Sequence, residues 1–141
     1  MKFTYTKTPA LDPLTKEKSA IYRPLIPIDL KADSKWFSEE YGSYLDALID
    51  SRADRNIAPL EIAELLQIDL SGIDPIETRG IEGGSVETFY TVLSFKIGGH
   101  SYDAPMGFGK SFPMILLGGS GFFDNWKINL DYPKDFELKR K

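Results

Sequence analysis

The chain has 141 residues, of which 42% are hydrophobic and 27% are charged, a composition typical of one globular domain. The formal net charge of −4 argues against a nucleic-acid partner and an anionic membrane surface, because both require clustered lysines and arginines. The absence of cysteine excludes disulfides and thiolate metal sites, and a single histidine, His100, argues against a histidine metal site or a Ser-His-Asp triad. We therefore expect no metal and no cofactor.

The two ends of the chain are predicted to lie outside the core. Residues 1–20 are polar and contain Pro9 and Pro13, which predicts an N-terminal arm, whereas residues 21–141 are predicted to form the domain. The N-terminus lacks the apolar segment of a signal peptide, and no apolar run is long enough to cross a membrane. These features predict a cytoplasmic protein. The basic residues 139–141 are interpreted as a solvated tail.

Strands are predicted in the first half of the domain. Ile26, Ile28 and Leu30 alternate with Pro27 and Asp29, which predicts a strand. Pro24 and Pro27 have no N–H to donate, so we expect an edge strand here. Residues 31–43 are predicted to be a loop anchored by aromatic side chains. Residues 44–50 are predicted to form the next strand.

A short amphipathic helix is predicted over residues 60–67. Pro59 suits the first turn of a helix, and Ile62, Leu65 and Leu66 would share one face.

The second half of the chain is predicted to be mostly strands. A glycine-rich hairpin tip is expected at residues 80–84, since glycine tolerates the positive φ of tight turns. Ser120 is predicted to cap a second short helix over residues 122–126. The predicted strands are 85–97, 100–108 and 114–117, followed by a hairpin over 128–138. The pattern as a whole predicts an all-β fold, mainly β with two short helices.

The candidate catalytic residues lie in one stretch, residues 48–54. An apolar run ends in Asp50, a hydroxyl follows at Ser51, and Ala53 and Asp54 come after it. The end of a strand holds a reactive side chain rigidly while leaving it accessible. The alternative interpretation is that Asp50 merely caps the turn that follows the strand.

This stretch resembles the signature of the retropepsin-like aspartic proteases, apolar-apolar-Asp-Ser/Thr-Gly-Ala-Asp. Asp50, Ser51, Ala53 and Asp54 match it, whereas Arg52 stands in place of the glycine. Two further landmarks follow in the order of the family. The glycine-rich hairpin at 80–84 corresponds to the flap, and Met114 to Gly118 corresponds to the apolar-apolar-Gly element that precedes a short helix.

The resemblance implies a retropepsin-like acid-protease half-barrel that is closed as a two-fold dimer, with peptide or protein as substrate. Asp50 from each copy would form the catalytic dyad, because two carboxylates must share one proton. Ser51 would hydrogen-bond across the dimer axis, and Asp54 would contact the substrate backbone. Residues of the signature and of the flap are predicted to bind substrate, namely Arg52, Ala53, Asp54, Gly80, Ile81, Glu82, Gly83 and Gly84.

Two departures from the family bear on activity. Arg52 adds bulk and a permanent positive charge beside the dyad, which opposes a shared proton. Gly119 stands where many members have an arginine that pairs with the equivalent of Asp54, and Arg52 or Arg55 is a candidate replacement for that partner. The alternative function is therefore a catalytically inactive dimerisation or peptide-binding module on the same fold.

A second motif belongs to another class of function. Residues 104–111 fit a relaxed phosphate-binding loop, Ala-Pro-Met-Gly-Phe-Gly-Lys-Ser. Such a loop needs a helix that begins at the Lys-Ser pair and directs its N–H groups at the phosphate. The sequence after Ser111 is strand-like, so nucleotide binding is not expected.

Overall fold

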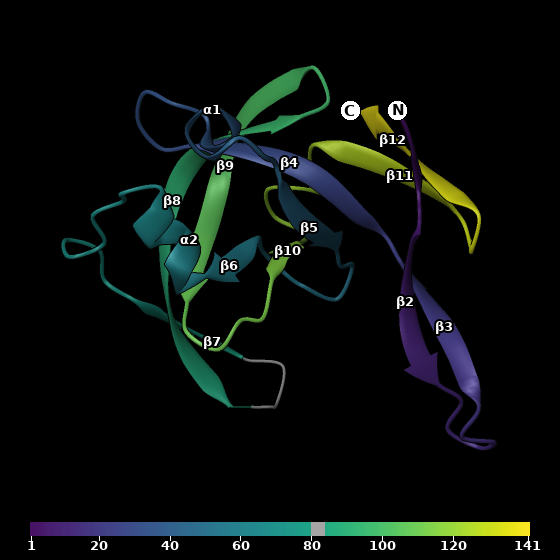
Figure 1. The fold of residues 1–141 in the computed structure, drawn as a ribbon. Coiled ribbons are helices and arrows are strands. Elements are labelled where there is room, and N and C mark those ends of the chain that lie inside the picture. The colour runs from purple at the N-terminus through teal and green to yellow at the C-terminus, as the bar shows by residue number, and fades with distance from the viewer. Residues whose placement is uncertain (80–83) are drawn as a thin grey trace.

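The computed structural model describes residues 1–79 and 84–141. Its largest sheet has seven strands in the order β4-β5-β10-β6-β9-β8-β7, and an additional pairing of β4 with β8 closes six of them into a barrel (Figure 1). Parallel pairs join β5 to β10 and β6 to β9. The strands are β4 (Leu25–Lys31), β5 (Leu45–Ile49), β6 (Ile57–Pro59), β7 (Ile76–Arg79), β8 (Ser85–Ile97), β9 (His100–Gly109) and β10 (Ile115–Leu117). The prediction of a mainly β fold is confirmed.

The long hairpin of β8 and β9 supplies much of the core. Leu93 lies opposite Ala104, and Phe95 lies opposite Tyr102. All four side chains are buried, because alternate residues of each strand point inward. Burying each large apolar side chain of this kind contributes about 1.5–3 kcal/mol. The hairpin therefore forms a rigid wall against which the shorter strands pack.

Strand β4 differs from the predicted edge strand. Its residues 25–28 pair with β5, and its residues 29–31 pair with β8, so β4 is the strand that closes the barrel. Pro27 lies in the first half, opposite Asp46, where β5 is its one partner among the described strands. A proline excludes a neighbour only beside its own missing N–H. The edge prediction was wrong because it extended that local rule to the whole strand.

The described residues contain two short helices, and one of them was not predicted. α2 (Leu60–Leu65) lies in the predicted place, although Ala63 is its buried residue and Leu65 is exposed. α1 (Phe37–Tyr41) lies within the predicted loop, where Ser38 donates its N–H and its hydroxyl to the buried Asp29 of β4. Neither helix is long and apolar enough to cross a bilayer, within residues 1–79 and 84–141.

The predicted helix over residues 122–126 is instead a series of turns. The N–H groups of Phe122 and Phe123 both bond to the carbonyl of Gly118, and Trp126 already begins the next strand. Phe122 and Trp126 are buried in the core. The prediction was wrong because tertiary packing of these aromatic side chains overrides the local helical pattern.

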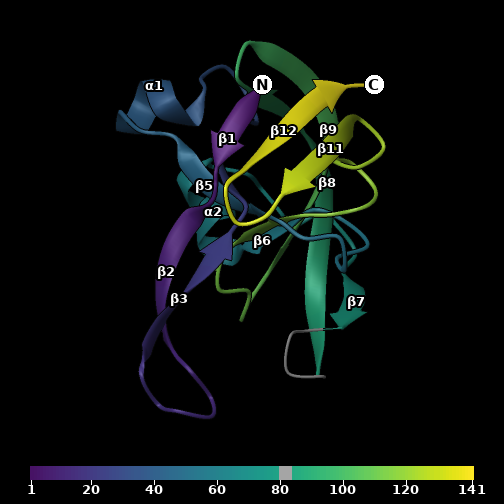
Figure 2. The same cartoon turned by 90° about the vertical axis from the view of Figure 1, so that its right-hand side faces the viewer.

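Both termini belong to a separate three-stranded sheet in the order β1-β12-β11, made of β1 (Lys2–Thr4), β11 (Trp126–Asp131) and β12 (Asp135–Arg140). β2 (Thr6–Leu11) and β3 (Lys18–Arg23) form a two-stranded hairpin that projects away from it (Figures 1 and 2). Phe3 stacks on the buried Phe136 at a ring distance of 5.5 Å. Residues 1–20 thus contain an ordered strand of a sheet, and the predicted boundary at residue 20 falls inside β3.

The buried Tyr102 makes a pH-dependent contribution to stability. Burial raises the pKa of Tyr102 to about 12, against the usual value of about 10. The unfolded chain therefore loses this proton first, and the free energy of unfolding is expected to fall by about 2–3 kcal/mol as the pH rises from about 10 to about 12. Urea denaturation of Tyr102→Phe beside wild type isolates the effect, because only the wild type carries this group. Parallel curves for both proteins across that pH range would contradict it.

Candidate active site

Asp50 sits at the end of an internal strand of the barrel. β5 lies between β4 and β10, and the N–H of Asp50 continues the pairing by donating to the carbonyl of Leu117 at 3.0 Å. The carboxylate Oδ1 then accepts the N–H of Arg52 at 2.9 Å, and the carbonyl of Asp50 accepts the N–H of Ala53 at 3.1 Å. These bonds hold the half-buried carboxylate of Asp50 in one orientation, at the residue where a tight turn begins.

Backbone hydrogen bonds join the loop that carries Asp50 to the residues after β10. Gly119 donates its N–H to the carbonyl of Ala53 at 2.9 Å, and Ser120 donates to the carbonyl of Asp54 at 2.8 Å. Gly118 lies so close that a Cβ there would be 2.5 Å from the carbonyl oxygen of Ala53. Only glycine fits at residue 118 without moving the backbone of the Asp50 loop.

Asn56 links three segments and was missed by the sequence analysis. Its buried side chain accepts the N–H of Gly118 at 3.0 Å and donates to the carbonyl of Pro105 at 3.3 Å. Its own carbonyl accepts the N–H of Gly107 at 2.9 Å. The sequence feature that could have identified Asn56 is its place directly before the apolar Ile57. A polar side chain beside a buried strand is itself often buried, and a buried amide must find hydrogen-bond partners.

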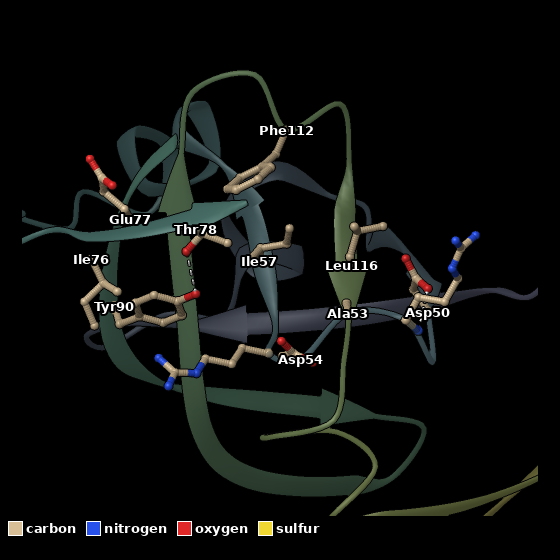
Figure 3. A pocket seen from close by; sticks show the side chains of 12 residues that line it. Asp50, Ala53, Asp54, Ile57, Ile76, Glu77, Thr78, Tyr90, Phe112 and Leu116 are labelled. Carbon is tan, nitrogen blue, oxygen red and sulfur yellow. Dashed lines mark hydrogen bonds between the residues drawn. The ribbon is translucent and has the colours of Figure 1, made fainter. Parts of the chain in front are cut away.

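A groove of about 720 Å³ runs from Asp50 to the β7–β8 hairpin (Figure 3). Asp50 lies toward one end of this view, Tyr90 and Ile76 lie toward the other, and Asp54 and Ile57 lie between them. Polar and apolar side chains thus share one surface. The lining residues are Asp50, Arg52, Ala53, Asp54, Arg55, Ile57, Ile76, Glu77, Thr78, Tyr90, Phe112 and Leu116.

The structure brings together four of the residues that were predicted from the signature. Asp50, Arg52, Ala53 and Asp54 all line the groove, whereas Ser51 is exposed and does not. Of the predicted flap residues, Gly80, Ile81, Glu82 and Gly83 lie outside the described residues. Gly84 is described, is exposed, and does not line the groove.

The groove also has a wall that sequence patterns did not indicate. The Arg55 guanidinium lies over the Tyr90 ring, 5.3 Å from its centroid, and the Tyr90 hydroxyl is 3.3 Å from the hydroxyl of Thr78. This chain of contacts joins the Asp50 loop to both strands of the β7–β8 hairpin. Contacts of this kind connect residues distant in sequence, so that no local pattern marks them.

The expected partner of Asp54 is not seen in the single chain. Among residues 1–79 and 84–141, neither Arg52 nor Arg55 forms an ion pair with Asp54. Arg55 instead stacks on Tyr90. The groove nevertheless mixes both signs of charge, with Arg52 and Arg55 beside Asp50 and Asp54.

Two other kinds of site find no support in the described part of the chain. No three His, Asp or Glu side chains there lie together as metal ligands. The phosphate-loop-like residues 104–111 run along β9 into a turn, and the strand β10 follows rather than a helix. A helix N-terminus that could hold phosphate is therefore absent at residue 110.

Comparisons with known proteins identify solved structures with a similar architecture. No protein-family model and no curated protein matches the chain. A retropepsin-like aspartic protease from Rickettsia conorii matches with a TM-score of 0.60 at 16% identity, over 82% of this chain and 89% of that one. The retroviral protease-like domain of Ddi1 from Leishmania major matches with a TM-score of 0.56 at 13% identity, over 78% and 82%.

A third similar structure is EIAV protease in complex with the inhibitor HBY-793, with a TM-score of 0.51 at 22% identity, over 77% of this chain and 88% of that one. The three similar structures differ widely in source, yet each shares most of its length with this chain. Together with the closed barrel described above, they show that the chain has the retropepsin-like fold.

Proposed function

We propose that this chain is an aspartic endopeptidase whose catalytic dyad is formed by Asp50 from each of two copies. One observation carries the proposal. Asp50 ends an internal strand, its carboxylate is oriented by the N–H of Arg52, and it lies on the surface of a groove in a retropepsin-like fold. A lone carboxylate cannot perform this chemistry, so the proposal requires a second copy related by a two-fold axis.

The chemistry needs two carboxylates in different protonation states. The ionised Asp50 would accept a proton from a water molecule while the oxygen of that water attacks the carbonyl carbon of the scissile peptide bond. The protonated Asp50 of the other copy would donate to the carbonyl oxygen. As the C–N bond breaks, the Asp50 that accepted the water proton would give it to the nitrogen of the leaving peptide, and the oxygen that was protonated would return its proton to the other Asp50 as the new carboxyl group forms. Two like charges close together cannot both ionise easily, which keeps one proton in the dyad.

The groove has features suited to an extended peptide. Ile57, Ile76, Phe112 and Leu116 offer apolar contacts to substrate side chains, while Asp54 offers an acceptor for peptide N–H groups. We assign the predicted flap, residues 80–84, to closure over the bound peptide, which would exclude water from the reaction. In this proposal Ser51 holds the two Asp50 loops together across the axis.

Arg52 favours a second candidate function, a catalytically inactive dimerisation or peptide-binding module. The side chain is exposed, lines the groove and follows Asp50 by two residues. A permanent cation there favours two ionised carboxylates, and a doubly ionised dyad has no proton to donate to the substrate carbonyl. Groove and dimer would persist in this module, and only cleavage would be lost.

Asp50→Asn separates the two functions. The substitution keeps the shape of the side chain but removes the base, so cleavage of an unfolded protein substrate near pH 5 is expected to fall by at least about 10²-fold. Mass spectrometry of the products measures the loss. A wild type without activity, or a variant that cleaves as well as wild type, would contradict the endopeptidase.

Mixing the same two proteins tests whether the dyad is shared. If two copies build one site, an excess of Asp50→Asn chain is expected to suppress wild-type activity, because most dimers then contain one carboxylate. Specific activity of wild type alone is expected to rise with protein concentration as dimers form. Activity that is insensitive to the added variant would show that each chain acts alone.

A further inference from the structure

The end of the groove near Tyr90 carries the guanidinium of Arg55. This side chain is exposed, lines the groove, and lies over the Tyr90 ring at 5.3 Å from its centroid. Within residues 1–79 and 84–141, Arg55 forms no ion pair, and the arginine that donates side-chain hydrogen bonds is Arg140. A guanidinium has five N–H donors, and stacking on a ring leaves those at its edge free. Arg55 therefore presents donors to a molecule that occupies the groove.

The Tyr90 ring is a fixed support for this guanidinium. Its hydroxyl lies 3.3 Å from the hydroxyl of Thr78 on β7. The ring also packs directly on Gly107, its partner in the register of β8 and β9, where an added Cβ would lie 2.5 Å from the ring carbon Cε1. These contacts restrict the ring, so the guanidinium stacked on it has little freedom to lose when it binds an anion.

The groove changes character along its length. Ile57, Phe112 and Leu116 form a small apolar cluster of their own and lie between Asp50 and Tyr90 in Figure 3. A peptide side chain close to the scissile bond therefore meets apolar surface. A side chain further along the peptide reaches the end near Tyr90 and meets the cation.

Two carboxylates that also line the groove leave Arg55 accessible. Neither Asp54 nor Glu77 forms an ion pair with it in the part of the chain that the structure describes. The Glu77 carboxylate points away from Tyr90, and Asp54 lies nearer the middle of the groove (Figure 3). The guanidinium is thus open to a carboxylate that the substrate brings.

We propose that Arg55 is a specificity-determining residue that selects a glutamate or aspartate side chain of the peptide substrate. This inference rests on the endopeptidase proposed above and assigns its substrate class. The planar guanidinium of Arg55 would donate two N–H groups to the two oxygens of the substrate carboxylate. Tyr90 would hold the guanidinium in place for that contact.

Two-fold symmetry makes this preference two-sided. The two Asp50 side chains of the proposed dimer meet at the axis, so the groove of each copy runs outward from the centre and ends at its own Arg55. A bound peptide passes apolar contacts at the centre and one Arg55 on either side. We therefore expect apolar residues at the scissile bond, with an acidic residue at a similar number of residues before and after it.

Cleavage of a mixture of unfolded proteins tests the preference directly, with mass spectrometry of the fragments giving the residues around each cut bond. Wild type is expected to favour glutamate over glutamine at the selected positions by about tenfold in kcat/KM, because the contact is a charge-assisted hydrogen bond. Arg55→Glu is expected to reverse the preference toward lysine, a result that misfolding cannot produce. Arg23→Glu makes the same change in charge on β3, outside the groove, and should keep the wild-type preference.

Binding to the Asp50→Asn chain measures the same preference without cleavage. The probes are short peptides with leucine and phenylalanine at the centre and alanine elsewhere, each carrying glutamate or, as its control, glutamine at one outer position. Fluorescence anisotropy is expected to show the best glutamate peptide binding about tenfold more tightly than its glutamine control. Adding Arg55→Glu should remove that difference and favour lysine at the same position.

The outcomes separate this inference from the endopeptidase. Cleavage that depends on Asp50 but is indifferent to glutamate, or that favours lysine in wild type, would overturn the role of Arg55 and leave the endopeptidase standing. Glutamate-selective binding that Arg55→Glu reverses, in a chain that cleaves nothing, would support the role of Arg55 and contradict the endopeptidase. A chain that neither cleaves nor binds any of the peptides would contradict both.

Discussion

Replacing Arg52 with glycine is expected to raise Asp50-dependent peptidase activity by roughly 10²-fold, the lower range of what positioned acid–base catalysis contributes. Arg52 lines the groove two residues after Asp50 and adds a fixed positive charge there. Its removal takes away the fixed charge that opposes a proton shared between two Asp50 side chains. The value of kcat/KM for an unfolded protein substrate near pH 5 measures the gain.

Two further variants identify which property of Arg52 matters. Arg52→Gln removes the charge while keeping most of the bulk, and it should approach the glycine variant if the charge is inhibitory. Arg52→Lys keeps the charge and should resemble wild type. Adding Asp50→Asn to Arg52→Gly should abolish the gain. A weaker dimer without any gain in activity would show instead that Arg52 pairs with Asp54 in the assembly, and a wild type as active as the variant would show that Arg52 points away from the dyad.

Gly118→Ala is expected to lower the free energy of unfolding by about 3 kcal/mol, at the upper end of the usual cost of overpacking. A Cβ at this residue would lie 2.5 Å from the carbonyl oxygen of Ala53 and 2.6 Å from that of Arg55. Both oxygens belong to the backbone of the Asp50 loop, so relief requires the loop to move. The bond from Gly118 to the Asn56 side chain would be strained at the same time. Urea denaturation at neutral pH gives the change in free energy.

Gly72→Ala is the matched control for this substitution. The same methyl group is added in a loop where a Cβ would meet nothing within 4 Å. Its effect is expected to stay within about 0.5 kcal/mol, as for other surface substitutions. If Gly118→Ala were as stable as Gly72→Ala, the close approach of Gly118 to the Asp50 loop would be contradicted. Loss of activity without loss of stability would instead indicate a small shift of the Asp50 loop.

Several features of this protein were determined by the sequence alone, because they depend on local periodicity. The apolar pattern predicted strands over residues 85–97 and 100–108, and the structure has β8 and β9 there. The signature placed Asp50 at the end of a strand, where the structure has it. These predictions agree with the structure because a strand with one buried face has little freedom to change its register.

Local pattern failed where packing between distant segments decides the structure. The stretch around Phe122 forms turns rather than a helix because its aromatic side chains fill the core, and α1 forms beside Asp29, which accepts two bonds from Ser38. Strand β4 closes the barrel because it changes partner midway along its length. No window of neighbouring residues contains that information.

The groove likewise belongs to the tertiary structure. Residues near Asp50 in sequence supply one side of it, and these could be named from the signature. The opposite side depends on Tyr90, which contacts Arg55 from the Asp50 loop and Thr78 from the β7–β8 hairpin. Asn56 and Gly118 meet in the same way across 62 residues of sequence. Such contacts form only when the barrel closes, since closure brings buried polar groups together and leaves them no water to bind.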